Sequence, residues 1–238
     1  MKLKVIIPNS GMDSETLKSR EEMLSECAAP GTKISVDCID KGPESIESAY
    51  DEVLASVYLL KKVIEAEENG FDAVIIYCGD DPAIGAAREL VDIPVVGPGK
   101  LSKLIAVDLA YKFSVITVLK CCIPGDTEEV YRKGIDMNRL ASVRSIDISV
   151  SDVREDLCET YKALLDVGRQ CVETDGAQCI VLSCLGMAGL AAQLTKELGV
   201  PVIDPAFAAV KYAELLVSIG ISHSKISHPR PMDKIRIE

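Results

Sequence analysis

Hydrophobic and polar positions alternate between two kinds of segment along the chain. Short runs rich in Val and Ile, apolar throughout, predict strands buried on both faces, and longer segments with helical spacing separate them. The predicted strands are residues 2–8, 33–39, 72–77, 93–97, 113–118, 141–148, 178–184 and 200–204. Helical patterns cover residues 44–69, as one long helix or two shorter ones, and residues 151–174 and 188–198. This order predicts βαβ units, and therefore an α/β fold with parallel strands and helices on both faces.

One arrangement of elements occurs twice. The stretches "FDAVIIYCGDDPAIGAARELVDIPVVG" and "AQCIVLSCLGMAGLAAQLTKELGVPVID" both run from a strand through a cysteine and a small-residue turn to a helix and a Pro-Val strand. Cys78 lies 16 positions before Pro94, and Cys184 lies 17 positions before Pro201. The duplication predicts two pseudo-symmetric α/β halves, with the active site in the cleft between them at the carboxyl ends of the strands.

Cys78 and Cys184 are therefore expected in equivalent places, each at a strand-to-helix corner. Unpaired N–H groups and the macrodipole at a helix N-terminus favour a thiolate, so we predict that the pKa of both thiols lies below the ordinary value of about 8.5. Two thiols on opposite sides of a substrate can remove a proton from one face of a carbon and return one to the other face. The pair predicts racemisation by opposed acid–base groups without a cofactor.

The remaining cysteines and the histidines indicate no competing chemistry. Cysteine is one of the most frequently buried residue types, so the other seven are expected to be structural. They are Cys27, Cys38, Cys121, Cys122, Cys158, Cys171 and Cys179. The only histidines, His223 and His228, lie in a polar C-terminal segment and are expected at the solvated surface. A Ser-His-Asp or Cys-His hydrolase would need one of them in the cleft, which disfavours that class.

Composition and charge limit the classes of binding partner that we expect. The net charge is −11 and the 26 Lys and Arg residues form no basic stripe, so neither nucleic acid nor an anionic membrane is an expected partner. The chain is 48% hydrophobic but has no apolar run of about 18 residues. The opening "MKLKVIIPNS" is interpreted as a strand and not as a signal peptide. We therefore expect a cytoplasmic protein with reduced thiols.

Weaker motifs support no cofactor or metal. The segment "GPGKLS" at 97–102 departs from a phosphate-binding loop and is interpreted as a strand-to-helix turn. No Gly-x-Gly-x-x-Gly follows the first strand and no Cys-x-x-Cys occurs, which disfavours dinucleotide and zinc sites. Asp81 directly before Pro82 predicts a helix N-cap with proline at the first helical position, and not a metal ligand.

Four stretches carry a resemblance that covers nearly the whole chain. They are "VIIPNSG" near the start, "CGDDP" followed by "ARE" and "IPVVG", "FSVITVL" at 113–119, and "LSCLGMAGL" followed by "GVPVIDPAFAAVKYAELL". The chain resembles the aspartate/glutamate/hydantoin racemase superfamily, and most closely its hydantoin and allantoin racemase branch. The resemblance implies two doubly wound α/β domains, residues 1–98 with 208–238 and the inserted residues 99–207.

The resemblance also implies roles for individual residues. Cys78 and Cys184 match the opposed acid and base of the family. The implied substrate contacts are Asn9, Ser10, Gly79, Asp80, Thr117, Ser183, Leu185 and Gly186. The implied activity is cofactor-independent racemisation of a carbon acid, a 5-substituted hydantoin or a related ureide such as allantoin.

The segments beside the cysteines depart from the branch that the chain resembles. That branch often has an aromatic residue after the first cysteine, where Gly79 stands here, and Gly-Cys-Ala-Gly-Met around the second, where this chain reads SCLGM. A negative Asp80 near the cleft would disfavour an anionic substrate or recognise an amino group. The alternatives are racemisation of aspartate or glutamate, maleate-type isomerisation by thiol addition, and a non-catalytic small-molecule sensor. A malonate-type decarboxylase needs one cysteine, so the pair counts against it.

Two expectations concern the surface. The C-terminal "ISHSKISHPRPMDKIRIE" is polar and contains proline, so we expect an extension that lies on the surface or on a partner subunit. The apolar residues of "VIDPAFAAVKYAELLV" predict a homo-oligomer, and the only other partner expected is a small-molecule substrate.

Overall fold

The computed structural model describes residues 1–235 and contains two four-stranded parallel sheets. The strand orders are β2-β1-β3-β4 and β6-β5-β7-β8, so both sheets have the same topology. The strands are β1 (Lys2–Ser10), β2 (Lys33–Ile39), β3 (Ala73–Ile76), β4 (Val95–Val96), β5 (Phe113–Thr117), β6 (Leu140–Ser145), β7 (Cys179–Leu182) and β8 (Val202–Ile203). The repeated topology confirms the α/β fold and the two predicted halves.

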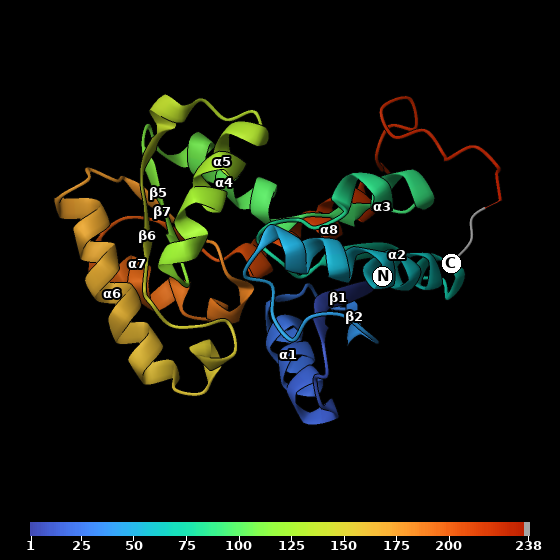
Figure 1. The fold of residues 1–238 in the computed structure, drawn as a ribbon, viewed down its shortest axis with the longest axis horizontal. Coiled ribbons are helices and arrows are strands. Elements are labelled where there is room, and N and C mark those ends of the chain that lie inside the picture. Colours follow the sequence, from blue (N-terminus) through green and yellow to red (C-terminus); the bar gives the residue numbers. More distant parts are fainter. Residues whose placement is uncertain (236–238) are drawn as a thin grey trace.

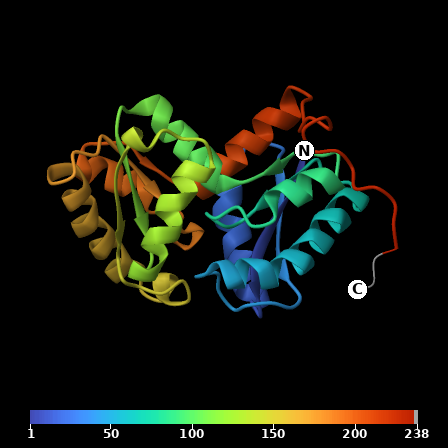
Figure 2. The ribbon, with the colours of Figure 1, turned by 45° about the horizontal axis from the view of Figure 1, so that its top comes forward.

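Helices follow the strands in both halves. They are α1 (Ser14–Cys27), α2 (Ala49–Glu68), α3 (Ile84–Leu90), α4 (Pro98–Leu109), α5 (Ile123–Arg132), α6 (Leu157–Glu173), α7 (Ala191–Leu198) and α8 (Pro205–Ser218). Figure 1 shows the two halves as neighbouring lobes, and Figure 2 shows α8 running from their junction towards the C-terminal extension. No helix within residues 1–235 is long and apolar enough to cross a membrane.

All eight predicted strands are present, and their ends differ for local reasons. The predicted bounds of β2 are the observed ones, whereas β1 continues through Pro8 to Ser10. The pairing of β1 with β2 shifts between Ile7 and Ser10, so the proline sits at a bulge, where its missing N–H breaks no ladder bond. The predicted helix over 44–69 begins only at Ala49, because the Ser48 side chain caps it by accepting a bond from the Asp51 N–H.

Each sheet is covered on both faces. On the first sheet, Val5 packs with α1 and α8 residues, and the next residue, Ile6, packs with α2 and α3 residues. On the second sheet, β7 alternates in the same way between a cluster with α6 and α7 and a cluster with α4 and α5. Strands buried on both faces require the apolar runs seen in the sequence. The division at residues 98/99 and 207/208 stays a prediction.

The two lobes meet through the backbone at the ends of β3 and β7. A Cβ atom on Gly79 would lie 1.8 Å from the Ser183 carbonyl oxygen, and one on Gly99 would lie 1.7 Å from the Gly79 carbonyl oxygen. Neither gap admits a side chain, so glycine is required for this approach. The segments that follow the two strands are thereby held in direct contact.

The C-terminal extension lies on α3 and β4 of its own chain, in agreement with the first of its two predicted placements. The Lys225 ammonium donates to the carbonyl oxygens of Arg88 and Val91, at 2.8 and 2.6 Å. The His223 Nε2 lies 2.8 Å from the Val95 carbonyl oxygen, and burial lowers its pKa to about 4. The prediction that both histidines are solvated is therefore wrong, because the ring of His223 is held against β4 and His228 is half-buried beside it.

Candidate active site

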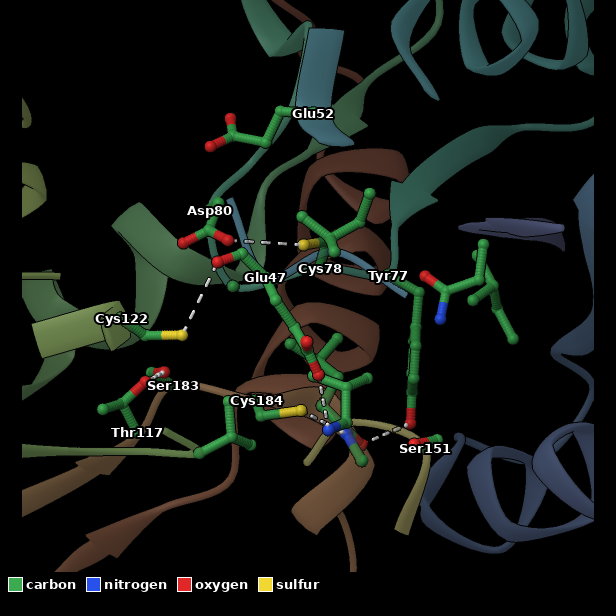
Figure 3. A pocket seen from close by; sticks show the side chains of 18 of the residues that line it. Glu47, Glu52, Tyr77, Cys78, Asp80, Thr117, Cys122, Ser151, Ser183 and Cys184 are labelled. Carbon is green, nitrogen blue, oxygen red and sulfur yellow. Dashed lines mark hydrogen bonds between the residues drawn. The ribbon is translucent and has the colours of Figure 1, made fainter. Parts of the chain in front are cut away.

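A cleft of about 960 Å³ lies at the carboxyl ends of the strands, between the two lobes. The ends of β1, β3, β5 and β7 all reach it, which is where parallel α/β sheets present ligand-binding residues. Every site residue predicted from the sequence lines this cleft: Asn9, Ser10, Cys78, Gly79, Asp80, Thr117, Ser183, Cys184, Leu185 and Gly186. Figure 3 shows several of these side chains directed into the same space.

Cys78 and Cys184 occupy equivalent positions after β3 and β7. The Cys184 Sγ accepts a hydrogen bond from the Gly186 N–H at 3.4 Å, within a 3₁₀ turn over Leu185–Met187. At Cys78 the N–H of Asp80, also two residues ahead, acts on the thiol in the same sense. Both thiols are half-buried and free. The internal duplication thus extends to the hydrogen bonding of the two sulfur atoms.

The expected lowering of the thiol pKa values is wrong. Burial raises the pKa of the Cys184 thiol to about 11, and burial followed by the charge of Asp80 raises that of Cys78 well above its ordinary value. Neither cysteine begins a long helix, since α3 starts only at Ile84 and α7 only at Ala191. The N–H bonds still favour thiolate, but removal of water from the thiols outweighs them.

Asp80 brings a carboxyl group beside the first thiol. Its Oδ2 lies 3.9 Å from the Cys78 Sγ, as drawn in Figure 3. Burial, and then the neighbouring carboxylates of Asp126 and Glu52, raise the pKa of Asp80 to about 7. This carboxyl group therefore titrates near neutrality, where an ordinary aspartate is fully ionised.

A hydroxyl pair joins the ends of β5 and β7. The Ser183 hydroxyl donates to the Thr117 Oγ1 at 3.2 Å and lies 3.3 Å from the Asp126 Oδ2. Asp126 is 4% exposed, and its other oxygen, Oδ1, has no hydrogen-bond partner among residues 1–235. Thr117 and Ser183 are thus held in place by each other, and Asp126 keeps an unused acceptor at the cleft.

Two side chains from the first lobe support the site in different ways. The Tyr77 hydroxyl donates to the Leu185 carbonyl oxygen at 3.1 Å and so ties the Cys78 segment to the Cys184 segment. Burial raises the pKa of Tyr77. The Ser10 hydroxyl donates to the Gly42 carbonyl oxygen at 2.8 Å, so its proton serves a loop and not the cleft.

Several cleft residues were missed in the sequence because they come from distant helices and loops. Arg20 of α1 lies near Cys184, since its charge acts on the pKa of that thiol, and the Arg154 guanidinium donates to the Gly186 and Ala188 carbonyl oxygens. Glu47 and Glu52 enter from the start of α2. The acidic residues after "KGPES" were the only sequence signal for Glu47 and Glu52. They did not indicate a site, because acidic residues are common in the first turn of a helix.

Three structural interpretations need correction. Cys121 and Cys158 are exposed and are therefore not core residues, whereas Cys122 is half-buried and packs against the core of the second lobe at the edge of the cleft. Asp81 does not cap the helix that follows it. Its carboxylate instead accepts bonds from the Gly99 and Lys100 N–H groups at 2.7 and 2.8 Å and caps α4. No group of three or more His, Cys, Asp or Glu residues suited to a metal ion occurs within residues 1–235.

Comparison with known proteins gives consistent matches over this fold. The family model described as Asp/Glu/Hydantoin racemase matches residues 3–213. A hydantoin racemase from Paenarthrobacter aurescens is 39% identical over 236 residues, which is 98% of this chain and 99% of that protein. One from Pseudomonas sp. (strain NS671) is 39% identical over 226 residues, 95% of this chain and 90% of that protein. The structure of allantoin racemase from Klebsiella pneumoniae has a TM-score of 0.92 at 33% identity and covers 100% of this chain and 96% of its own.

Proposed function

The chain belongs to the Asp/Glu/Hydantoin racemase family, and on that basis we propose that it racemises a 5-substituted hydantoin or a related ureide with Cys78 and Cys184 as the acid–base pair. The similar curated proteins are named racemases, so the enzyme is an isomerase. The observation that supports the cysteine pair is their equivalent placement in two duplicated lobes that open on one cleft.

The reaction needs only proton transfer. The thiolate of one cysteine takes the proton from C5 of the ring, and the C–H electron pair moves into the ring as an enolate on the C4 carbonyl oxygen. The opposite thiol then gives its proton to the other face of C5, which restores the carbonyl and leaves the second cysteine as thiolate. Fixed N–H dipoles beside the two cysteines would stabilise the enolate charge as it develops.

The two thiols are not in equal surroundings. The Cys184 Sγ accepts a hydrogen bond from the Gly186 N–H, and the charge of Arg20 partly offsets the effect of the Asp80 carboxylate on the pKa of this thiol. Cys78 instead faces the Asp80 carboxyl group at 3.9 Å. Because a nearby cation favours a thiolate and a nearby carboxylate disfavours it, Cys184 ionises more easily than Cys78 and acts as the first base, with Cys78 as the acid. This difference predicts that the resting enzyme reacts first with one enantiomer.

The charge of the cleft argues against the amino-acid alternative. Nine acidic and only three basic side chains line it. Aspartate and glutamate carry two carboxylates and one ammonium group each, and such a cleft repels their net negative charge, whereas an unsubstituted hydantoin ring carries no full charge at neutral pH.

Proton exchange at C5 tests the proposal. Single enantiomers of 5-substituted hydantoins and allantoin, with aspartate as the amino-acid comparison, are incubated in D₂O and followed by NMR together with optical rotation. The wild-type enzyme should exchange the C5 proton with inversion. Cys78→Ser and Cys184→Ser should each lose inversion, and each should retain slow exchange with the enantiomer that its remaining thiol can reach.

The control is Cys158→Ser, which removes an exposed thiol of α6 outside the cleft and should behave like the wild type. Exchange that survives in both cleft variants with unchanged inversion would remove the cysteine pair from the mechanism. A wild-type enzyme that exchanges no ureide but consumes maleate, or forms a stable thioether adduct with it, would replace the racemase with the thiol-addition isomerase. Ligand binding without turnover in every variant would identify the sensor.

A further inference from the structure

The charged side chains that act on Cys78 differ from those that act on Cys184. Asp80, with Asp126 and Glu52 close enough to act on its pKa, lies on the Cys78 side. Arg20 lies on the Cys184 side, and Arg154 is held there by the carbonyl oxygens of the Leu185–Met187 turn and Ala188. Carboxyl groups therefore predominate around Cys78, and two guanidinium groups lie on the side of Cys184.

The acidic end holds more carboxylates than cations. The ammonium groups of Lys103, which is 1% exposed, and of Lys133 lower the pKa of Asp80, but burial and the carboxylates of Asp126 and Glu52 outweigh them. The Lys133 ammonium is committed to Asp81 at 3.0 Å and to Glu129. Arg132 pairs with Glu128 at 3.4 Å. Among residues 1–235, the Glu52 carboxylate has neither a hydrogen bond nor an ion pair, and the buried Asp126 Oδ1 has no hydrogen bond. Two acceptors are thus left without a donor at the same end of the cleft.

The space continues beyond these carboxylates. A second cavity of about 360 Å³ is lined by Glu52, Asp80, Glu129 and Arg132, all of which also line the main cleft, and by Lys133. Figure 3 shows the Glu52 side chain next to Asp80 and Cys78, above both of them in this view. A substituent that leaves C5 on the Cys78 side would therefore have both carboxyl groups as neighbours.

Burial without a counter-ion is unfavourable for a carboxylate, and a cation from the ligand would relieve it. The pKa of Glu52 is raised by burial and by Glu129, in the same sense as that of Asp80. A substrate with an anionic substituent would add a further like charge, and a neutral substituent would leave the carboxylates unpaired. A cationic substituent is the only one of the three that offsets them.

We propose that the cleft selects ring ureides whose C5 substituent ends in a cation, an alkylammonium or guanidinium group, and that Glu52 and Asp80 receive it. This inference rests on the proposed racemase function. It assigns Glu52 as a specificity residue that touches the substituent and takes no part in proton transfer. Recognition of a group remote from C5 acts on binding, so the selectivity should appear mainly in KM.

Three hydantoins of similar size test the assignment: 5-(3-aminopropyl)hydantoin, 5-butylhydantoin and 5-(2-carboxyethyl)hydantoin. For the wild type, kcat/KM should be about tenfold higher for the amine than for the neutral butyl compound, and lower again for the carboxylate, as expected for one partly hydrated charge pair. Glu52→Gln should bring the amine-to-butyl ratio close to one. Glu26→Gln makes the same charge change at an exposed carboxylate of α1 that lines neither cavity, and should keep the ratio.

A salt series provides a readout that needs no variant. Raising the ionic strength from about 0.05 to about 0.5 M should lower the amine-to-butyl ratio, because exposed charge pairs are screened over a shorter distance. Equal kcat/KM values for all three compounds, or a ratio unchanged in Glu52→Gln, would overturn the cation selectivity while the hydantoin racemase stands. Absence of racemisation with every ureide would overturn the racemase proposal and the selectivity together.

Discussion

The stability of the Asp80→Asn variant should depend on pH in a defined direction. Burial and the carboxylates of Asp126 and Glu52 raise the pKa of Asp80 in the folded protein from 3.8 to about 7. Between these values the unfolded chain has lost the proton and the folded chain keeps it, so wild-type stability falls as pH rises through this window. Asparagine has no proton to lose, so the variant should escape the loss.

The magnitude follows from the shift. About three pKa units correspond to about 4 kcal/mol of unfolding free energy, which is an upper limit because part of the Asp80 side chain faces the cleft water. We expect the variant to equal the wild type near pH 4 and to be more stable by about 2 kcal/mol above pH 7. The Asp80 carboxyl group thus lowers the free energy of unfolding at neutral pH. Its replacement should also reduce turnover, because it lies in the proposed active site.

Urea unfolding followed by circular dichroism, at pH values from 4 to 8, measures the difference. Asp108→Asn, at an exposed position of α4, is the matched control and should show no such trend. A difference between Asp80→Asn and wild type that stays constant from pH 4 to pH 8, or a variant that is less stable than the wild type above pH 7, would refute the assignment of a raised pKa to Asp80.

Three further predictions concern the cysteine segments. Alkylation of Cys184 by iodoacetamide can be followed by mass spectrometry, with the exposed Cys158 as the internal reference. The rate at Cys184 should still rise about tenfold per pH unit at pH 9, because burial raises the pKa of the Cys184 thiol to about 11. A rate that reaches a plateau below pH 8 would contradict this. Gly79→Ala should destabilise the protein by about 3 kcal/mol in thermal unfolding, since its Cβ would lie 1.8 Å from the Ser183 carbonyl oxygen. Gly85→Ala, whose Cβ would meet no atom within 4 Å, should be neutral or stabilising. Equal effects of the two variants would argue against the contact. Tyr77→Phe should lose about 1 kcal/mol of stability with the bond to the Leu185 carbonyl oxygen, and its kcat should fall while KM changes little; an unchanged kcat would limit Tyr77 to a structural role.

Much of the fold was accessible from the sequence because its information is local. Strands buried on both faces must be apolar throughout, so the runs at 72–77 and 113–118 identify β3 and β5 without knowledge of their neighbours. The duplicated spacing around Cys78 and Cys184 then places both cysteines at strand ends that reach one cleft.

The errors arose where the outcome depends on distant contacts. Asp81 precedes a proline as an N-cap does, yet its carboxylate reaches α4, and Ala83 adopts a left-handed conformation before α3 begins. The thiol pKa values depend on how much water the opposite lobe excludes, which no local pattern records. Arg20 and Glu52 come from helices that only the tertiary fold brings to the same cleft.

The direct contact between the two strand-end segments has a consequence for how the enzyme opens. Gly79 touches the Ser183 carbonyl group without an intervening side chain, and the Tyr77 hydroxyl bond lies beside this contact. A rocking motion of one lobe on the other would have this point as its fulcrum. Atoms far from a fulcrum travel a long way and atoms beside it barely move. Such a motion would widen the outer mouth of the cleft for substrate entry and product release, while the sulfur atoms of Cys78 and Cys184, close to this contact, would keep their spacing.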